Sequence, residues 1–258
     1  MATKTPLRPA LSDTQLAEMM SLLRGSDTVE LKLTVPDSAQ RAAIRGLGLD
    51  ALDAQTRQVV FFDTPDLALD RAGVVVRARR IQGRAGDSVI KLRPLDPDRV
   101  DADVRGLNGF GVEVDVIPGG FVCSGRLKCD VESDATRRVL LGERAVRKLY
   151  TKQQRALFEA HAPDGIELDD LAALGPIFVL KLKWQPRGFA RKMVAEMWLY
   201  PDGARIFELS TKCLPSEAFD VAAAARVFLA EHGIDLSGEQ QTKTRTALEF
   251  FSSELASG

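Results

Sequence analysis

Histidine and cysteine are scarce in this chain of 258 residues, which contains two histidines and three cysteines. So few histidines (His161 and His232) argue against a histidine-rich metal site and against a Ser-His-Asp triad. The cysteines (Cys123, Cys129 and Cys213) are odd in number and lack CxxC spacing. That pattern is typical of reduced thiols rather than of a disulfide framework or a zinc site. Any bound metal is therefore expected to have carboxylate ligands, which favours Mg²⁺ or Mn²⁺.

Long apolar runs and a surplus of one charge are also missing. No apolar run approaches the roughly 18 residues that a membrane span needs, and the N-terminal MATKTPLRPA has no apolar segment of the signal-peptide kind. Lysine and arginine number 35 against 36 aspartates and glutamates, so bulk charge does not suggest nucleic-acid binding. We expect a soluble, cytoplasmic protein with no membrane partner and no specific nucleic-acid partner.

Hydrophobic patterning divides the chain into an α+β series of elements. Residues 1–27 are expected to form a loose tail and one amphipathic helix, and residues 28–255 a single domain. Strands are predicted at 28–35, 56–62, 73–81, 88–93, 111–118, 175–184, 194–200 and 205–212, while 119–133 is left open as an irregular strand. Further helices are predicted at 36–47, 134–142, 151–161, 216–232 and 239–255.

An apolar stripe runs along the predicted helix 216–232 and includes Phe219, Ala223 and Val227. It is interpreted as a face that packs on the sheet, and the alternative is the surface of a homodimer. Trp198 is interpreted as a packing residue beneath the helices rather than as a substrate contact.

Six of the predicted strands carry ionisable side chains at alternate positions, with apolar side chains between them. Alternation places the charges on one face of each strand. One interpretation is an open antiparallel sheet whose charged face is exposed to solvent. The other is a closed barrel whose charged faces line a hydrated lumen. Like charges about 7 Å apart on one strand repel unless a ligand neutralises them, which favours the lumen.

A charged lumen defines two groups of candidate residues. The cations that would surround a chain of phosphates are Lys32, Arg77, Arg79, Lys91, Arg93, Lys181, Lys183 and Lys212. The acids that would hold Mg²⁺ or Mn²⁺ against those phosphates are Glu30, Glu113, Asp115 and Glu208. The alternative for Glu113 and Asp115 is simple charge balance against the cations.

The segment FFDTPDLALDRAGVVVRARR (61–80) resembles the signature of the CYTH superfamily, the triphosphate tunnel metalloenzymes. The matching residues are the turn Asp63-Thr64-Pro65-Asp66-Leu67, followed by Leu69, Gly73, Arg77 and Arg79. VIKLRP, with Lys91, and GVEVDV resemble the next two strands of the family, and the likeness extends over roughly residues 28–250. The resemblance implies an eight-stranded antiparallel tunnel with flanking helices that binds a triphosphate with a divalent metal. Family members include inorganic triphosphatases, thiamine triphosphatases and class IV adenylyl cyclases.

Two departures from the family pattern affect its carboxylates. The family opens with E-x-E-x-K, and this chain has Thr28 at the first position. The family closes with a strand carrying E-x-E, for which two segments compete here. One supplies Lys181 and Lys183, and the other supplies Glu208 and Ser210. With either alignment the metal site has fewer carboxylates than the family pattern.

The resemblance implies metal-dependent hydrolysis of inorganic triphosphate, thiamine triphosphate or a nucleotide. The expected catalytic residues are Glu30, Lys32 and Lys148. Arg147 and Lys148 resemble a basic strand that assists the leaving group, and the alternative is a solvated cluster at a helix edge. The depleted carboxylates favour a second hypothesis, a non-catalytic protein that binds polyphosphate or a nucleotide. An adenylyl cyclase of class IV type is less favoured, because no feature of the sequence indicates adenine recognition.

Overall fold

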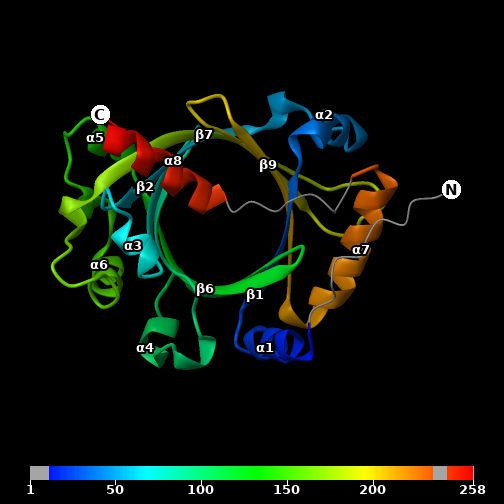
Figure 1. Cartoon of the computed structure of the whole chain (residues 1–258), viewed down its shortest axis with the longest axis horizontal. Helices are drawn as coiled ribbons and strands as arrows, with labels where there is room; N and C mark the ends of the chain where they lie inside the picture. The colour runs from blue at the N-terminus through cyan, green and yellow to red at the C-terminus, as the bar shows by residue number, and fades with distance from the viewer. Residues whose placement is uncertain (1–11, 235–242, 258) are drawn as a thin grey trace.

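The computed structural model describes residues 12–234 and 243–257, and in them nine strands close into a barrel (Figure 1). The order around the barrel is β1-β5-β6-β4-β3-β2-β7-β8-β9, and β9 pairs with β1. The strands are β1 (Thr28–Val35), β2 (Gln55–Asp63), β3 (Val74–Ile81), β4 (Gly86–Leu92), β5 (Phe110–Ile117), β6 (Gly120–Val131), β7 (Ala172–Trp184), β8 (Met193–Leu199) and β9 (Arg205–Cys213).

The barrel corrects the expectation of eight antiparallel strands in two respects. The ninth strand is β6, which lies in the segment left open by the sequence and pairs with both β4 and β5. Ser124 and Gly125 interrupt the apolar alternation of this strand, which concealed it in the sequence. The pair β1–β5 is parallel, and the other pairs are antiparallel.

Helices cover the outer, apolar faces of the strands, as the lumen interpretation predicts. One layer contains α1 (Asp13–Arg24), α2 (Asp37–Gly46) and α7 (Ala218–Glu231), which pack over β1, β5 and β9. A second layer contains α3 (Ala68–Arg71), α5 (Ala135–Leu140) and α6 (Lys152–Glu159), over β2, β3, β4 and β6. The short α4 (Ala102–Arg105) precedes β5. Within the described ranges, no helix has the length and apolar character that crossing a membrane requires.

The apolar stripe predicted on α7 lies on the opposite face of the helix from the one that packs. Phe219 and Val227 are 49% and 57% exposed, whereas Val221, Ala225 and Phe228 are buried against the barrel. The run of four alanines at 222–225 makes the helix apolar on every side, so the sequence alone does not fix its orientation. A homodimer formed through this exposed face stays a prediction.

Helix α8 (Lys243–Ser257) lies across one end of the barrel (Figure 1). Its Ala247 and Leu248 pack on inward-facing apolar residues of the strands, among them Phe61, Ile177 and Trp198. Trp198 is therefore a packing residue beneath a helix, as predicted, and the helix that covers it is α8 at the end of the barrel. Residues 239–242 of the predicted helix, like residues 1–11 of the predicted tail, lie outside the described residues.

The turn between β2 and β3 sets the direction in which Arg77 and Arg79 point. The Asp63 carboxylate accepts hydrogen bonds from three backbone N–H groups of the turn (Thr64, Leu69 and Asp70). Gly73 has φ 75°, and a Cβ at that position would lie 2.7 Å from the carbonyl oxygen of Arg93. A side chain there would be strained, so glycine fits the start of β3. The D-T-P-x-L segment thus fixes the register that turns both arginines inward.

Candidate functional site

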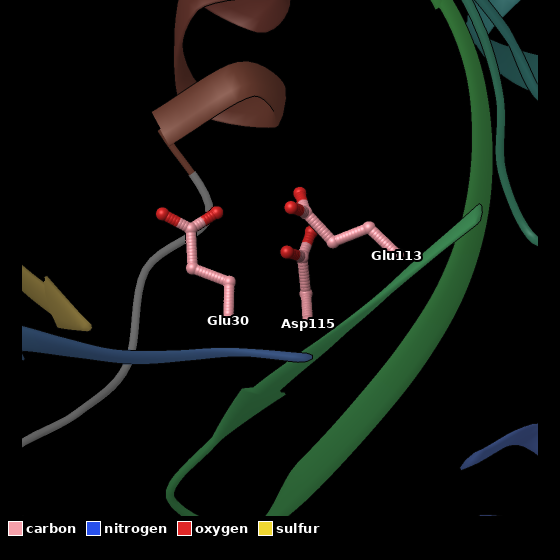
Figure 2. A group of neighbouring side chains, drawn as sticks. All are labelled: Glu30, Glu113 and Asp115. Carbon is pink, nitrogen blue, oxygen red and sulfur yellow. The ribbon is translucent and has the colours of Figure 1, made fainter. Parts of the chain in front are cut away.

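Three carboxylates from two neighbouring strands meet inside the barrel. Parallel register pairs Glu30 of β1 with Asp115 of β5, and Glu113 lies two residues earlier on β5. Oxygen atoms from the three side chains lie within 4.8 Å of one another, and Figure 2 shows the carboxylates pointing toward a common space. An all-oxygen ligand set of this kind fits Mg²⁺ or Mn²⁺. We call Glu30, Glu113 and Asp115 the acidic trio.

Three cations surround Asp115. Lys32 Nζ lies 2.7 Å from Asp115 Oδ1 and 3.2 Å from Glu30 Oε2. Lys91 Nζ and Arg93 Nη2 lie 3.4 Å and 3.0 Å from Asp115 Oδ2. Burial alone would raise the pKa of Asp115, but these cations hold it well below its ordinary value. Burial, together with Lys32 and Arg93, lowers the pKa of Lys91 to about 8 against the opposing effect of Asp115.

Lys212 and two hydroxyl groups complete the surroundings of the trio. Lys212 contacts Glu113 and lies 3.7 Å from Glu30 Oε2. Thr28 Oγ1 donates to Glu113 Oε2 at 3.3 Å, and Ser210 Oγ donates to Glu30 Oε1 at 3.0 Å. Burial would raise the pKa of Glu30, but the neighbouring lysines outweigh it and hold that pKa at about 2. The hydroxyls therefore support the remaining carboxylates at the two positions where the family pattern has acids.

A second acidic pair is neutralised by lysines, one of which comes from α8. Glu196 of β8 and Glu208 of β9 are register partners. Lys181 Nζ lies 2.6 Å from Glu196 Oε1, and Lys243 Nζ lies 2.6 Å from Glu208 Oε1 and also contacts Glu196. Burial would raise the pKa of Glu196, but the two lysines lower it well below its ordinary value. Glu208 is thus engaged by Lys243 and lies apart from the acidic trio, so its role as a metal ligand stays a prediction.

The wall formed by β3 and β4 carries cations with fewer partners. Arg79 donates from Nε and Nη2 to the two carboxylate oxygens of buried Asp87, at 2.7 and 2.8 Å. Arg77 forms no ion pair with the described residues, and its buried Nε has no hydrogen-bond partner. Burial and the neighbouring Arg79 lower the pKa of Arg77 to about 10. Arg126 of β6 faces the same space, since it is the register partner of Lys91.

Two of the predicted site residues lie outside the barrel. Arg147 and Lys148 belong to a short 3-10 turn (Val146–Leu149), and both are exposed. Arg147 Nη1 pairs with Asp169 Oδ2 at 3.1 Å. Leu149 anchors the turn in the core beneath α5 and α6. The expected basic strand is therefore a 3-10 turn with exposed side chains, and a role of Arg147 or Lys148 at the leaving group stays a prediction.

The remaining predicted residues line the lumen, and of the two candidate acidic strands it is β9 that lies beside β1. β9 pairs with β1 and brings Ser210 beside Lys32, whereas β7, with Lys181 and Lys183, pairs with β2 and β8. Sequence reasoning missed Arg57, Asp87, Arg126, Lys128, Glu196 and Lys243, which also carry charge in or beside the lumen. Those on strands stand at alternate positions and are detectable by the same periodicity. Lys243 is not, because its position depends on where α8 docks.

No family model and no curated protein matches the chain. Among solved structures, a candidate adenylate cyclase from Bacillus halodurans matches with a TM-score of 0.58 and 11% identity, over 85% of this chain and 97% of that chain. A candidate adenylyl cyclase from Hippeastrum, described as having a dominant triphosphatase activity, matches with a TM-score of 0.59 and 17% identity, over 83% and 92%. The chain therefore shares the barrel fold of these two solved structures.

Proposed function

We propose that the barrel binds a triphosphate-containing substrate with Mg²⁺ or Mn²⁺ and hydrolyses it. The observation that carries this proposal is that one side of the lumen presents carboxylates and another side presents cations. The acidic trio occupies β1 and β5, and β3 presents Arg77, which has no acceptor among the described residues. A triphosphate with a divalent ion needs both, since oxygen ligands hold the ion and guanidinium groups hold the phosphates. The triphosphatase activity described for the Hippeastrum protein supports the same class of ligand.

Each part of the lumen has a role in this reaction. Glu30, Glu113 and Asp115 would hold the divalent ion, which when bound screens phosphate charge and lowers the pKa of a water. Arg77 and Arg79 would orient the phosphates and neutralise charge that develops in the transition state.

Lys32 lies between the two sides, because its amine reaches both Glu30 and Asp115. Lys32 and Glu30 are therefore the proposed catalytic residues. Lys148 is not included, since it lies outside the barrel wall.

The test is phosphate release from tripolyphosphate, thiamine triphosphate and ATP, with and without Mg²⁺ or Mn²⁺. We expect metal-dependent release from at least one substrate, and its loss in Glu113→Gln. Arg77→Gln should weaken substrate binding about 10- to 100-fold, because hydrogen bonds to charged groups contribute about 1.5–3 kcal/mol. Arg41→Gln, which removes an exposed charge on α2, serves as the control and should leave release unchanged.

A second candidate function is the non-catalytic binding of polyphosphate or a nucleotide. It is favoured by the hydroxyl groups of Thr28 and Ser210, which stand where the family pattern has acids. It is also favoured by the ion pair between Lys243 and Glu208, which engages that carboxylate. Tight polyphosphate binding without phosphate release from any substrate would replace the hydrolase with this binder. Cyclic AMP as the only product from ATP would replace both with a cyclase.

A further inference from the structure

Cations continue from the wall of β3 to one mouth of the barrel. Arg57 and Lys183 are inward positions near the start of β2 and the end of β7. Arg84 lies in the loop between β3 and β4, Lys128 near the end of β6, and Lys192 directly before β8. We call these five residues the cationic mouth.

The cationic mouth lies at the end of the barrel that α8 leaves uncovered. Helix α8 contacts the opposite ends of the same strands, since Ser252 Oγ donates to the Pro65 carbonyl beyond β2. Tyr200, just after β8, likewise donates from its hydroxyl to the carbonyl of Lys243. Helix α8 therefore does not block an anion that enters the lumen through the cationic mouth.

These cations have few acidic partners among the described residues. Lys128 Nζ lies 3.6 Å from Asp87 Oδ2, a carboxylate that Arg79 already binds through two hydrogen bonds. Arg57 is 6% exposed, donates to the Gln55 side chain at 2.8 Å, and has a buried Nε without a partner. Arg84, Lys183 and Lys192 form no ion pair within the described ranges.

The cations also lie close enough to act on one another. Burial lowers the pKa of Lys183, and Arg57, Arg84, Lys128 and Lys192 lower it further. The pKa of Arg57 is lowered by burial and then by Arg79 and Arg84. Mutual repulsion therefore links Arg79 on β3, through Arg57, to Arg84 in the loop at the mouth. An anion bound at the mouth would reduce this repulsion.

An open pocket of about 820 Å³ lies beside this mouth on the outer side of the wall, since Gln58 and Arg80 alternate with the inward Arg57 and Arg79. It is lined by Arg57, Arg80 and Arg84, with Asp134 as an acid and Phe178 as the aromatic side chain. A single aromatic offers little for the base stacking on which single-stranded nucleic-acid binding depends. Closely spaced cations with little stacking surface suit a chain of bare phosphates.

We propose that the cationic mouth is a second anion subsite, which holds phosphates that continue from the triphosphate beside Arg77, so that the ligand is a linear polyphosphate longer than three phosphates. From Arg77 to the end of β3 at Ile81 the strand rises about 13 Å. Phosphates at the mouth are therefore additional to those beside Arg77. This inference rests on the proposed function, because both subsites belong to one lumen.

The test compares the binding of tripolyphosphate with that of a longer linear polyphosphate of defined length, by calorimetry on the full chain. The variant is Arg84→Gln with Lys183→Gln, two exposed side chains whose loss should not disturb folding. The control is Arg41→Gln with Arg226→Gln, which removes the same charge from exposed positions on α2 and α7.

We expect the wild type and the control to bind the longer chain at least about tenfold more tightly than tripolyphosphate. The mouth variant should bind both ligands with nearly the affinity that the wild type has for tripolyphosphate. Three outcomes would overturn the inference alone: no gain with chain length, an equal loss in the control variant, or equally tight binding of a single-stranded oligonucleotide. Failure to bind either phosphate ligand would overturn the proposed function, and the inference with it.

Discussion

Arg77 and Arg79 form a matched pair, since they lie two residues apart on β3, both face inward and differ in their partners. Arg79 binds both oxygens of buried Asp87, whereas Arg77 has no acceptor among the described residues. Arg77→Met removes a half-buried cation that has no ion-pair partner among the described residues, and it keeps the unbranched apolar part of the side chain. Arg79→Met leaves the Asp87 carboxylate buried without its main partner. The two substitutions should therefore change stability in opposite directions.

The magnitudes follow from these surroundings. The lowered pKa of Arg77, about 10, corresponds to a cost of about 1–3 kcal/mol for its charged form, so Arg77→Met should raise the free energy of unfolding by that amount. Breaking a buried ion pair costs about 3–5 kcal/mol. Because Lys128 stays 3.6 Å from Asp87, we expect Arg79→Met to lower the free energy of unfolding by about 2–4 kcal/mol.

Urea unfolding with and without tripolyphosphate measures both effects. Ligand at about 100 times its Kd stabilises a protein by about 2.7 kcal/mol. We expect that gain in the wild type and a smaller gain in both variants at the same concentration, about 0.4–1.4 kcal/mol for Arg77→Met if binding weakens about 10- to 100-fold. Equal destabilisation by Arg77→Met and Arg79→Met would refute the claim that Arg77 lacks a partner. An undiminished gain in Arg77→Met would refute its role in binding phosphate.

Three further predictions concern the acids of the lumen. Lys243→Met removes the lysine that pairs with Glu208, so the free energy of unfolding should fall by about 2–4 kcal/mol. The backbone amides of α8 should also exchange faster with deuterium. Unchanged exchange would show that Lys243 does not hold the helix in place. Burial would raise the pKa of Asp87, but the neighbouring Arg79 lowers it below the ordinary value of 3.8. A carboxyl group whose pKa is lowered on folding stabilises the folded state above its ordinary pKa. That stabilisation is lost as the pH falls through the folded-state pKa. The deficit of Asp87→Asn in urea unfolding should therefore be complete at pH 7 and shrink below about pH 4, and a deficit that is constant with pH would contradict the pairing. Ser210→Glu adds an acid beside Glu30 and should tighten Mn²⁺ binding about tenfold in calorimetry, whereas unchanged affinity would place the ion elsewhere.

The grouping of the charges on one face of each strand was predictable from the sequence, because alternation fixes which residues share a face. Arg77, Arg79 and Lys91 point into the lumen as that alternation requires. The resemblance at the D-T-P-x-L turn added closure of the sheet, which periodicity alone does not determine. The sequence leaves the β6 segment open as an irregular strand, since its glycines and serine hide its alternation, and Arg126 and Lys128 are missed with it.

The acidic trio depended on a pairing that the sequence does not reveal. Glu30 meets Asp115 because β1 and β5 run parallel, although the strands are separated by some eighty residues. Lys243 reaches Glu208 only because α8 packs into the end of the barrel. Arg147 and Lys148 had a basic pattern that fitted the family, but their turn lies against the outer wall. Long-range contacts of this kind leave no local signal in the chain.

A crystal structure of the chain with tripolyphosphate and Mn²⁺ would test the central claim most directly. The anomalous signal of manganese should lie among the carboxylates of Glu30, Glu113 and Asp115, with a phosphate in hydrogen-bond contact with the guanidinium of Arg77. A manganese ion outside the acidic trio, or phosphates bound only on the outer surface of the barrel, would contradict the account.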